Sequence, residues 1–337
     1  MAFIHEAEQG LPRIARPLSW NHESSLLGKP KADSSGGVTP PVELQPRPLA
    51  PTIRTDPKGL QFAEMEIRFD EEDKILWQYM RPKGRPSYTM GLLRDMRQVL
   101  SSVERMFAET DQDKDKDAPV RYLVLASRMP GIFNLGGDLP LFVELIRAGN
   151  RDALRNYAHA CINVQYPRAI NLDLPYISIS LVQGDALGGG FEAALADNVI
   201  IAERSAKFGL PEILFNLYPG MGAYSFLSRR LDPVAAERMI LSGKIFSAEE
   251  LHEMGIVDVL AEDGEGETAV YDFVARNRRS YHARRALCEA RRIARPITRE
   301  ELISITDLWV DAALCLAAAD LRKMERLASA QDRKKQI

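Results

Sequence analysis

The chain has 337 residues, 45% of them hydrophobic, with a formal net charge of −3. This composition is typical of a globular protein with a sizeable core, and the near-neutral charge gives no support for nucleic-acid binding. The sequence has no run of about 18 apolar residues, no signal-peptide pattern and no metal-ligand spacing among its cysteines. We therefore expect a cytoplasmic protein with reduced thiols, no membrane span and no bound metal.

Residues 1–58 differ in composition from the rest of the chain. They are rich in proline, contain Ser34-Ser35-Gly36-Gly37 and show no hydrophobic periodicity. Such a segment cannot bury enough apolar surface to fold alone, so we predict a disordered N-terminal tail over residues 1–58. The alternative is an arm that packs on a neighbouring subunit.

From residue 59 onward, hydrophobic periodicity predicts strands that alternate with helices. Alternation at residues 62–69, an acidic turn and a returning strand at 74–79 indicate a hairpin. The pattern predicts an α/β core over residues 59–262 and a helical C-terminal segment over residues 263–337. The other predicted strands are 122–126, 176–182 and 198–202, and the predicted helices are 90–107, 138–148, 151–165, 191–196 and 302–327.

Two glycine turns each stand between a predicted strand and a predicted helix. They are Gly136-Gly137 and Gly188-Gly189-Gly190. Glycine permits positive φ and close approach of a ligand to the backbone, and the following helix presents free N–H groups to that ligand. Each turn alone is explained by plain turn chemistry. Together they predict two N–H donors for one developing oxyanion.

Two glutamates lie in apolar surroundings beside these turns. Glu192 is the one charged residue of the short helix at 191–196, and Glu212 lies between Pro211 and Ile213. Burial raises the pKa of a carboxyl and suits it to proton transfer, whereas the alternative for Glu192 is a surface residue that stabilises a helix start. No GxSxG or GxxxxGK[ST] motif is present and the histidines are scattered. The sequence therefore favours acid–base chemistry on a thioester.

These motifs resemble those of the crotonase (enoyl-CoA hydratase/isomerase) superfamily. The resemblance rests on Gly136-Gly137-Asp138, on Gly188 to Glu192 and on Leu210-Pro211-Glu212. It covers about residues 60–332, and the first 58 residues lie outside it. Longer strings are similar to bacterial diffusible signal factor synthases; they lie at residues 133–139, 188–195, 209–212, 218–226 and 305–311.

The resemblance implies a spiral of ββα turns with a helical C-terminal part, assembled as a homotrimer or a dimer of trimers. By position, Gly137 and Gly189 match the donors of the oxyanion N–H groups. Glu192 and Glu212 match the two catalytic acids, and no cofactor is implied beyond the thioester of the substrate.

The resemblance also implies a set of substrate-binding residues. Leu187, Met221 and Trp309 match positions that line an acyl pocket, with ordinary core packing as the alternative. Gly136 and Asp138 belong to the turn that would hold the substrate carbonyl. The thioester carrier would be CoA or acyl carrier protein. An acidic carrier protein needs a basic rim at the pocket; the candidates are Arg81, Lys83, Arg85 and Arg128, with a solvated charged loop as the alternative for each.

The function implied is that of an acyl-thioester dehydratase and thioesterase. Such an enzyme converts a 3-hydroxyacyl thioester into a free 2-unsaturated fatty acid, of cis geometry, that serves as a diffusible signal. The hydrolysis step and the cis geometry rest on the resemblance alone. Two alternatives stay open: an enoyl-CoA hydratase/isomerase of fatty-acid degradation, and a non-enzymatic binding module with the crotonase fold.

Overall fold

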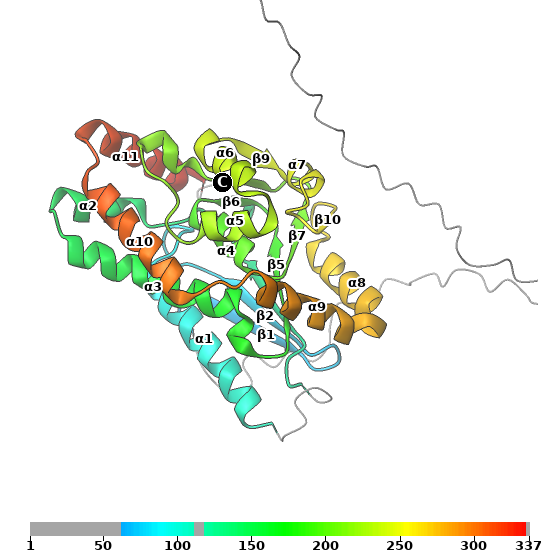
Figure 1. The fold of residues 1–337 in the computed structure, drawn as a ribbon. Helices are drawn as coiled ribbons and strands as arrows, with labels where there is room; N and C mark the ends of the chain where they lie inside the picture. Colours follow the sequence, from blue (N-terminus) through cyan, green and yellow to red (C-terminus); the bar gives the residue numbers. More distant parts are fainter. Residues whose placement is uncertain (1–61, 111–117, 335–337) are drawn as a thin grey trace, which may run out of the picture. The chain divides into compact units, whose positions relative to one another are not determined.

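A six-stranded sheet is the largest element of the fold in the computed structural model, which describes residues 62–110 and 118–334 (Figure 1). In spatial order its strands are β1 (Met65–Asp70), β2 (Ile75–Met80), β3 (Tyr122–Ser127), β5 (Ile177–Val182), β7 (Val199–Glu203) and β10 (Val259–Ala261). β1 and β2 form the predicted hairpin, and the other neighbours in this sheet are parallel. The tail predicted over residues 1–58 lies outside the described residues.

Four short strands form a second sheet, in which three parallel strands are closed by one antiparallel strand. They are β4 (Ile132–Asn134), β6 (Asp185–Leu187), β8 (Lys207–Gly209) and the antiparallel β9 (Ile245–Ser247). After β4, β6 and β8 the chain enters, respectively, α2 (Leu139–Arg147), α4 (Gly189–Ala196) and η2 (Pro211–Phe215). Each of these three units begins with a strand of the large sheet, so a ββα unit repeats along the chain. This is the spiral that the resemblance implies.

The three turns between short strand and helix lie together in space. Because the carboxyl ends of parallel strands meet at one edge of a sheet, β4, β6 and β8 deliver their turns to the same place. A Cβ atom on Gly136 would lie 2.9 Å from the backbone nitrogen of Gly189, so the first two turns touch. A Cβ atom on Gly188 would lie 2.4 Å from Oε1 of Glu212, so the second and third touch as well. Only glycine permits such close approach.

Helices cover both faces of the large sheet. The further helical segments are α1 (Met90–Ala108), α3 (Arg151–Ala169), η1 (Asn171–Asp173), α5 (Ala223–Arg230), α6 (Pro233–Ser242), α7 (Ala248–Glu253), α8 (Gly266–Asn277), η3 (Arg278–Ser280), α9 (Tyr281–Ala294), α10 (Arg299–Leu314) and α11 (Ala318–Lys334). Trp77 and Val124 point to one face and pack with Val270 of α8. Leu76 and Leu123 point to the other face, into the cluster that contains α1 and α3. The alternation follows from the two-residue period of a strand.

The prediction of a single helix over residues 302–327 is wrong. The segment is divided between α10 and α11, which are bent by 110°. The carboxylate of Asp320 accepts a hydrogen bond of 3.2 Å from the N–H of Ala317, which caps the new helix start. α11 then packs along α2 with Leu321 and Met324 buried. No described helix is alone long and apolar enough to cross a membrane; α10 and α11 meet that test only as this bent pair.

Candidate active site

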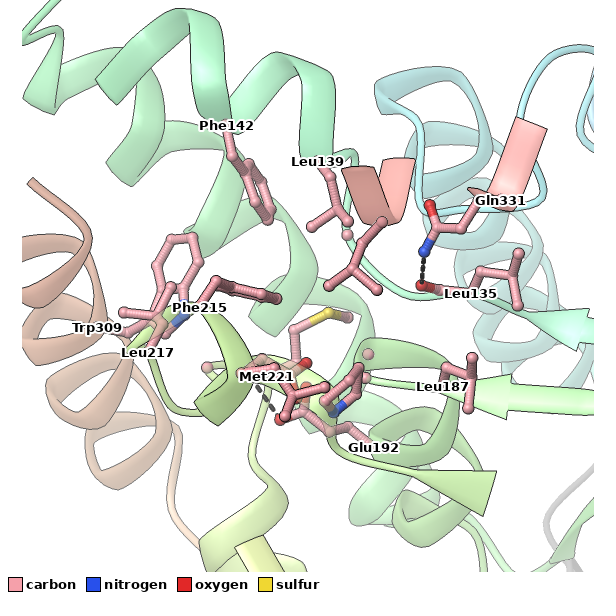
Figure 2. A pocket seen from close by; sticks show the side chains of 18 of the residues that line it. Leu135, Leu139, Phe142, Leu187, Glu192, Phe215, Leu217, Met221, Trp309 and Gln331 are labelled. Carbon is pink, nitrogen blue, oxygen red and sulfur yellow. Dashed lines mark hydrogen bonds between the residues drawn. The ribbon is translucent and has the colours of Figure 1, made fainter. Parts of the chain in front are cut away.

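A cavity of about 300 Å³ lies at the edge where the three turns meet (Figure 2). Part of its wall carries the two glycine turns and both glutamates, and most of the remainder is apolar. Side chains of α2, α3, η2, α10 and α11 complete the wall, so segments far apart in the sequence enclose one space. The lining includes Leu135, Gly137, Leu139, Phe142, Tyr157, Cys161, Leu187, Gly189, Glu192, Glu212, Leu217, Met221, Trp309, Leu327 and Gln331.

The first glycine turn aims the N–H of Gly137 at this cavity. Gly136 has a φ of 91°, and its carbonyl accepts a hydrogen bond of 2.8 Å from the N–H of Tyr88. Because a trans peptide is planar, the N–H of Gly137 points the opposite way from the carbonyl of Gly136. Gly137 itself lines the cavity, so its N–H is directed there rather than toward Tyr88.

The second glycine turn presents the N–H of Gly189 from the start of α4. Gly188 has a φ of 50°, and its carbonyl accepts a hydrogen bond of 3.0 Å from the N–H of Glu192. That bond runs along the helix, so the N–H of Gly189 points back out of the first turn, where a helix has no internal acceptor. Since this nitrogen lies beside Gly136, the two amides border the same part of the cavity. This is the arrangement that an oxyanion hole requires.

Glu192 is buried at the inner side of the cavity. Its side chain is 1% exposed, and Oε1 accepts hydrogen bonds of 2.7 Å from the N–H of Met221 and 2.9 Å from the N–H of Ala223 (Figure 2). Burial raises the pKa of Glu192 to about 7, although the two N–H bonds favour the charged form. The carboxyl can therefore take or give a proton near neutral pH.

Glu212 reaches the same cavity from η2. Its Oε2 is buried, and no hydrogen-bond partner for this atom lies within the part of the chain that the structure describes. Burial raises the pKa of Glu212 to about 8, with the negative charge of Glu192 as the second cause. Glu192 accepts two N–H bonds that stabilise its charged form, whereas Oε2 of Glu212 has none within the described residues, so Glu212 is the better site for a proton that the pair shares.

The cavity also contains a thiol, but acid–base chemistry fits it better. Cys161 lines the wall, and burial raises the pKa of its thiol well above the usual range, which makes it a poor nucleophile. Over residues 62–110 and 118–334, no group of three or more His, Cys, Asp or Glu side chains is placed to hold a metal ion. Two carboxyls with raised pKa beside two amide donors can move protons next to an oxygen that gains negative charge.

The three residues expected to bind an acyl chain, Leu187, Met221 and Trp309, all lie on the cavity wall. Trp309 packs flat on the chain at Gly220, where a Cβ atom would lie 2.5 Å from Cγ of the indole. Its ring meets that of Phe142 with 5.2 Å between centroids and an interplanar angle of 66° (Figure 2). The apolar part of the cavity is therefore bounded by an aromatic pair.

Gly136 and Asp138 are not among the described residues that line the cavity. The carboxylate of Asp138 accepts a hydrogen bond of 3.4 Å from the N–H of Leu141 and so caps α2. Gly136 supplies the left-handed conformation of the turn and the close contact with Gly189. Both residues shape the turn that carries Gly137.

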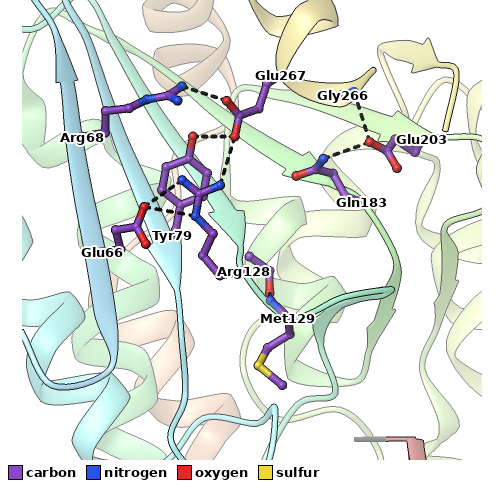
Figure 3. Close-up of polar contacts among 10 residues, drawn as sticks. Glu66, Arg68, Tyr79, Arg128, Met129, Gln183, Glu203, Gly266 and Glu267 are labelled. Atoms are coloured by element: carbon purple, nitrogen blue, oxygen red, sulfur yellow. Dashed lines mark hydrogen bonds and ion pairs between the residues drawn. The ribbon is translucent and has the colours of Figure 1, made fainter. Parts of the chain in front are cut away.

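None of the four residues considered for a basic rim lines the cavity. Arg128 instead lies on the face of the large sheet that α8 covers (Figure 3). Its guanidinium stacks on the ring of Tyr79 at 3.5 Å and pairs with Glu66 at 2.7 Å and with Glu267 at 3.3 Å. The structure therefore shows Arg128 in an ion-pair and stacking network on that face, away from the residues that line the cavity.

Sequence reasoning named no residue of α11 or α3 in the site. Leu327 and Gln331 line the cavity, and Nε2 of Gln331 donates a hydrogen bond of 3.1 Å to the carbonyl of Leu135. Leu327 and Gln331 are four residues apart and therefore share one face of the helix, but the sequence does not show which part of the protein that face contacts. Tyr157 is also in the wall. In the sequence, Tyr157 is only a tyrosine on the apolar face of a predicted helix, and such a residue more often belongs to the ordinary core than to a functional site.

Comparisons with known proteins agree with this geometry. The model of the enoyl-CoA hydratase/isomerase family matches residues 80–290. The mitochondrial methylglutaconyl-CoA hydratase of Rattus norvegicus is 28% identical over 201 residues, which cover 59% of this chain and 62% of that protein. An enoyl-CoA isomerase/hydratase of Mycosarcoma maydis is 30% identical over 182 residues, which cover 54% of this chain and 62% of that protein. These matches span less than two thirds of either relative.

Solved structures share the fold at lower identity. The structure of Pseudomonas aeruginosa DspI is similar with a TM-score of 0.60 and 22% identity, over 82% of this chain and 100% of that one. An enoyl-CoA hydratase from Bacillus halodurans gives a TM-score of 0.63 at 18% identity, over 79% of this chain and 100% of that one. With the family model matched over more than half of its length, the chain belongs to the enoyl-CoA hydratase/isomerase family and has the crotonase fold.

Proposed function

We propose that this protein dehydrates a 3-hydroxyacyl thioester and then hydrolyses the product to a free 2-unsaturated fatty acid. The observation that carries the proposal is the meeting of two carboxyls, the buried Glu192 and the half-buried Glu212, with two amides, Gly137 and Gly189, on one apolar cavity. The substrate carbonyl would accept hydrogen bonds from both amides. Negative charge builds on that oxygen when the α-proton leaves, and again when water attacks the carbonyl, so one oxyanion hole can serve both steps.

The surroundings of the two carboxyls suggest how one shared proton is used. Two N–H bonds stabilise the carboxylate of Glu192, whereas Glu212 has a buried oxygen without a partner in the described residues, so the preferred state is ionised Glu192 and protonated Glu212. Dehydration starts from the reverse state: Glu212 takes the α-proton and Glu192 gives its proton to the departing 3-hydroxyl, which leaves as water. This step restores the preferred state.

The restored state is also the one that hydrolysis needs. Ionised Glu192 can take a proton from a water molecule that attacks the thioester carbonyl, and protonated Glu212 can give its proton to the departing thiolate. The C–S bond breaks, a C–O bond forms, and the products are a carboxylic acid and a thiol. The motif strings similar to diffusible signal factor synthases support this second step and a cis product.

Hydration of an enoyl-CoA, as in fatty-acid degradation, is the second candidate, and the family match favours it. It uses the same preferred state, with Glu192 as base for water and Glu212 as donor to the α-carbon. A non-enzymatic binding module is the third candidate; it would need neither carboxyl.

The test compares two substrates with the purified protein: crotonyl-CoA, and a long 3-hydroxyacyl group on acyl carrier protein or CoA. Mass spectrometry should detect a free 2-unsaturated acid from the long substrate, and Glu212→Gln should abolish its release. Rapid crotonyl-CoA hydration without acid release would replace the proposal by the hydratase. Full activity of Glu212→Gln on both substrates, or no turnover of either by the wild type, would end both enzyme assignments.

A further inference from the structure

The hydroxyl of Tyr157 hydrogen-bonds to two chain segments beside Gly137: the segment that contains Tyr88 and the turn that leads into α2. Tyr157 comes from α3 and is 3% exposed. Its hydroxyl donates a hydrogen bond of 2.5 Å to the carbonyl of Tyr88 and accepts one of 3.1 Å from the N–H of Asp138. The N–H of Tyr88 in turn donates to the carbonyl of Gly136 at 2.8 Å. Hydrogen bonds therefore hold the peptide on each side of Gly137.

We infer that Tyr157 is a positioning residue for the oxyanion-binding turn, an inference that rests on the proposed function. The peptide between Gly136 and Gly137 carries the catalytic N–H and is held at its carbonyl by Tyr88. The next peptide is held at the N–H of Asp138 by Tyr157. The same hydroxyl also donates to the carbonyl of Tyr88. It therefore fixes the position of Tyr88 relative to Asp138, the two residues whose hydrogen bonds orient the peptides on either side of Gly137. Its removal would free the direction of the Gly137 N–H without deleting that donor.

The two glycine turns differ in what fixes them, and this explains why only the first needs a tyrosine. The N–H of Gly189 belongs to the first turn of α4, so helical hydrogen bonding sets its direction. Gly136 and Gly137 precede α2 and have the wide conformational freedom of glycine. Their orientation must come from neighbours. Asn134 contributes by accepting a hydrogen bond of 2.8 Å from the N–H of Gly136, and Tyr157 secures the far side of Gly137.

The ring of Tyr157 is held independently of its hydroxyl. It meets the ring of Phe142 edge to face, with 5.0 Å between centroids. Burial keeps the pKa of Tyr157 well above its usual range, so the hydroxyl stays protonated and remains a donor to Tyr88. Tyr157→Phe should therefore retain the packing and delete the bonds of the hydroxyl to Tyr88 and Asp138, together with its hydrogen bond with the thiol of Cys161.

The experiment compares Tyr157→Phe with a matched control, Tyr176→Phe. Tyr176 is also buried, and its hydroxyl has no hydrogen-bond partner within the described residues. The readouts are kcat, KM and the absorption of a bound 4-dimethylaminocinnamoyl-CoA, a chromophore that shifts to longer wavelength as its carbonyl is polarised. Tyr157→Phe should lower kcat roughly 10-fold with little change in KM, less than the 10²–10³-fold loss for a deleted oxyanion donor.

The same variant should shift the chromophore less than the wild type does, and the amide of Asp138 should exchange hydrogen faster by mass spectrometry. Tyr176→Phe should match the wild type in all readouts. A wild-type chromophore shift in folded Tyr157→Phe would overturn the inference, even with reduced kcat, because the effect would then not act through the oxyanion turn. Failure of the proposed function is distinct: the wild type itself would not shift the chromophore, or Glu192→Gln would retain full turnover.

Discussion

Two groups of carboxylates lie on opposite faces of the large sheet, and they differ in whether a cationic side chain pairs with them. Under α8, Glu66 and Glu267 meet Arg68, Arg128 and the hydroxyl of Tyr79, so each negative charge has a cationic partner (Figure 3). In the cavity, Glu192 (Figure 2) and Glu212 have mostly apolar neighbours, and each lies close enough to the other for their charges to interact.

The difference shows how the fold separates stability from chemistry. Burial raises the pKa of Glu192 to about 7 and that of Glu212 to about 8, whereas the glutamates under α8 are paired with arginines. A carboxylate that is paired with arginine holds elements together but cannot exchange protons usefully at neutral pH. Glu192 and Glu212 have no cationic partner among the described residues, so their charged forms are costly to bury, and both carboxyls are suited to proton transfer.

Glu192→Gln should give the largest effect and is the strongest test of this comparison. Glutamine can still accept the N–H bonds of Met221 and Ala223, so the fold should persist, but it cannot exchange a proton. We expect turnover to fall by roughly 10²–10⁴-fold. Glu267→Gln is the matched control and should retain wild-type kcat. Equal losses in the two variants would show that the two faces do not differ in function.

Gly188→Ala should have the next largest effect. Its φ of 50° is unfavourable for alanine, and the added Cβ would lie 2.4 Å from Oε1 of Glu212. The carboxyl must move away from the turn, and a displacement of about 1 Å can cost about 10²-fold in rate. Steady-state kinetics should show the loss mainly in kcat. Gly149→Ala also has a positive φ but an open surrounding, so it should lose stability without losing kcat.

Glu212→Gln should change how the thermal stability of the protein depends on pH. The pKa of Glu212 is raised from its usual value near 4.5 to about 8, so the folded state binds more protons than the unfolded state between these values. Stability from this group is complete below about pH 4.5 and is lost as the pH rises through about 8. Glu212→Gln should therefore raise Tm at pH 8 and leave it nearly unchanged at pH 5. Calorimetry at both pH values measures this, and a lower Tm at pH 8 would contradict it.

Arg128→Gln should have the smallest effect. The side chain of Arg128 is 35% exposed, so its ion pairs are screened by water, and we expect a loss of about 0.5 kcal/mol in the free energy of unfolding. Denaturant unfolding should show this change, with activity unaltered. A marked increase in the KM of Arg128→Gln for a carrier-protein substrate would instead indicate that Arg128 binds the carrier.

The four residues named from the sequence, Gly137, Gly189, Glu192 and Glu212, all lie on one cavity, and their catalytic roles remain a prediction. The two acids were singled out by their apolar neighbours, and the two glycines by the family resemblance. Periodicity predicted the long strands at 122–126, 176–182 and 198–202, but not the short strands β4, β6 and β8 that lead directly into the turns. Their meeting in one place depends on the parallel pairing of β4, β6 and β8, which sequence alone indicated only through the family resemblance.

Long-range packing accounts for what sequence reasoning could not reach. The break between α10 and α11 follows from the burial of Leu321 against α2, which local propensity does not encode. Arg128 was one of four candidates for a basic rim, and its partners on the face under α8 could not be predicted, because a residue that follows a strand can point either way. The link from Tyr157 of α3 to Tyr88, in the segment before α1, joins residues 69 positions apart and has no local pattern.

The reversal of direction at the start of α11 has a practical outcome for anyone handling this protein. It returns the chain to the cavity, where Gln331 is tethered to the loop that precedes the first glycine turn. A fluorescent reporter attached to the last turns of α11 would therefore lie close to that tether. Kinetic constants measured with such a conjugate should be checked against the unlabelled protein.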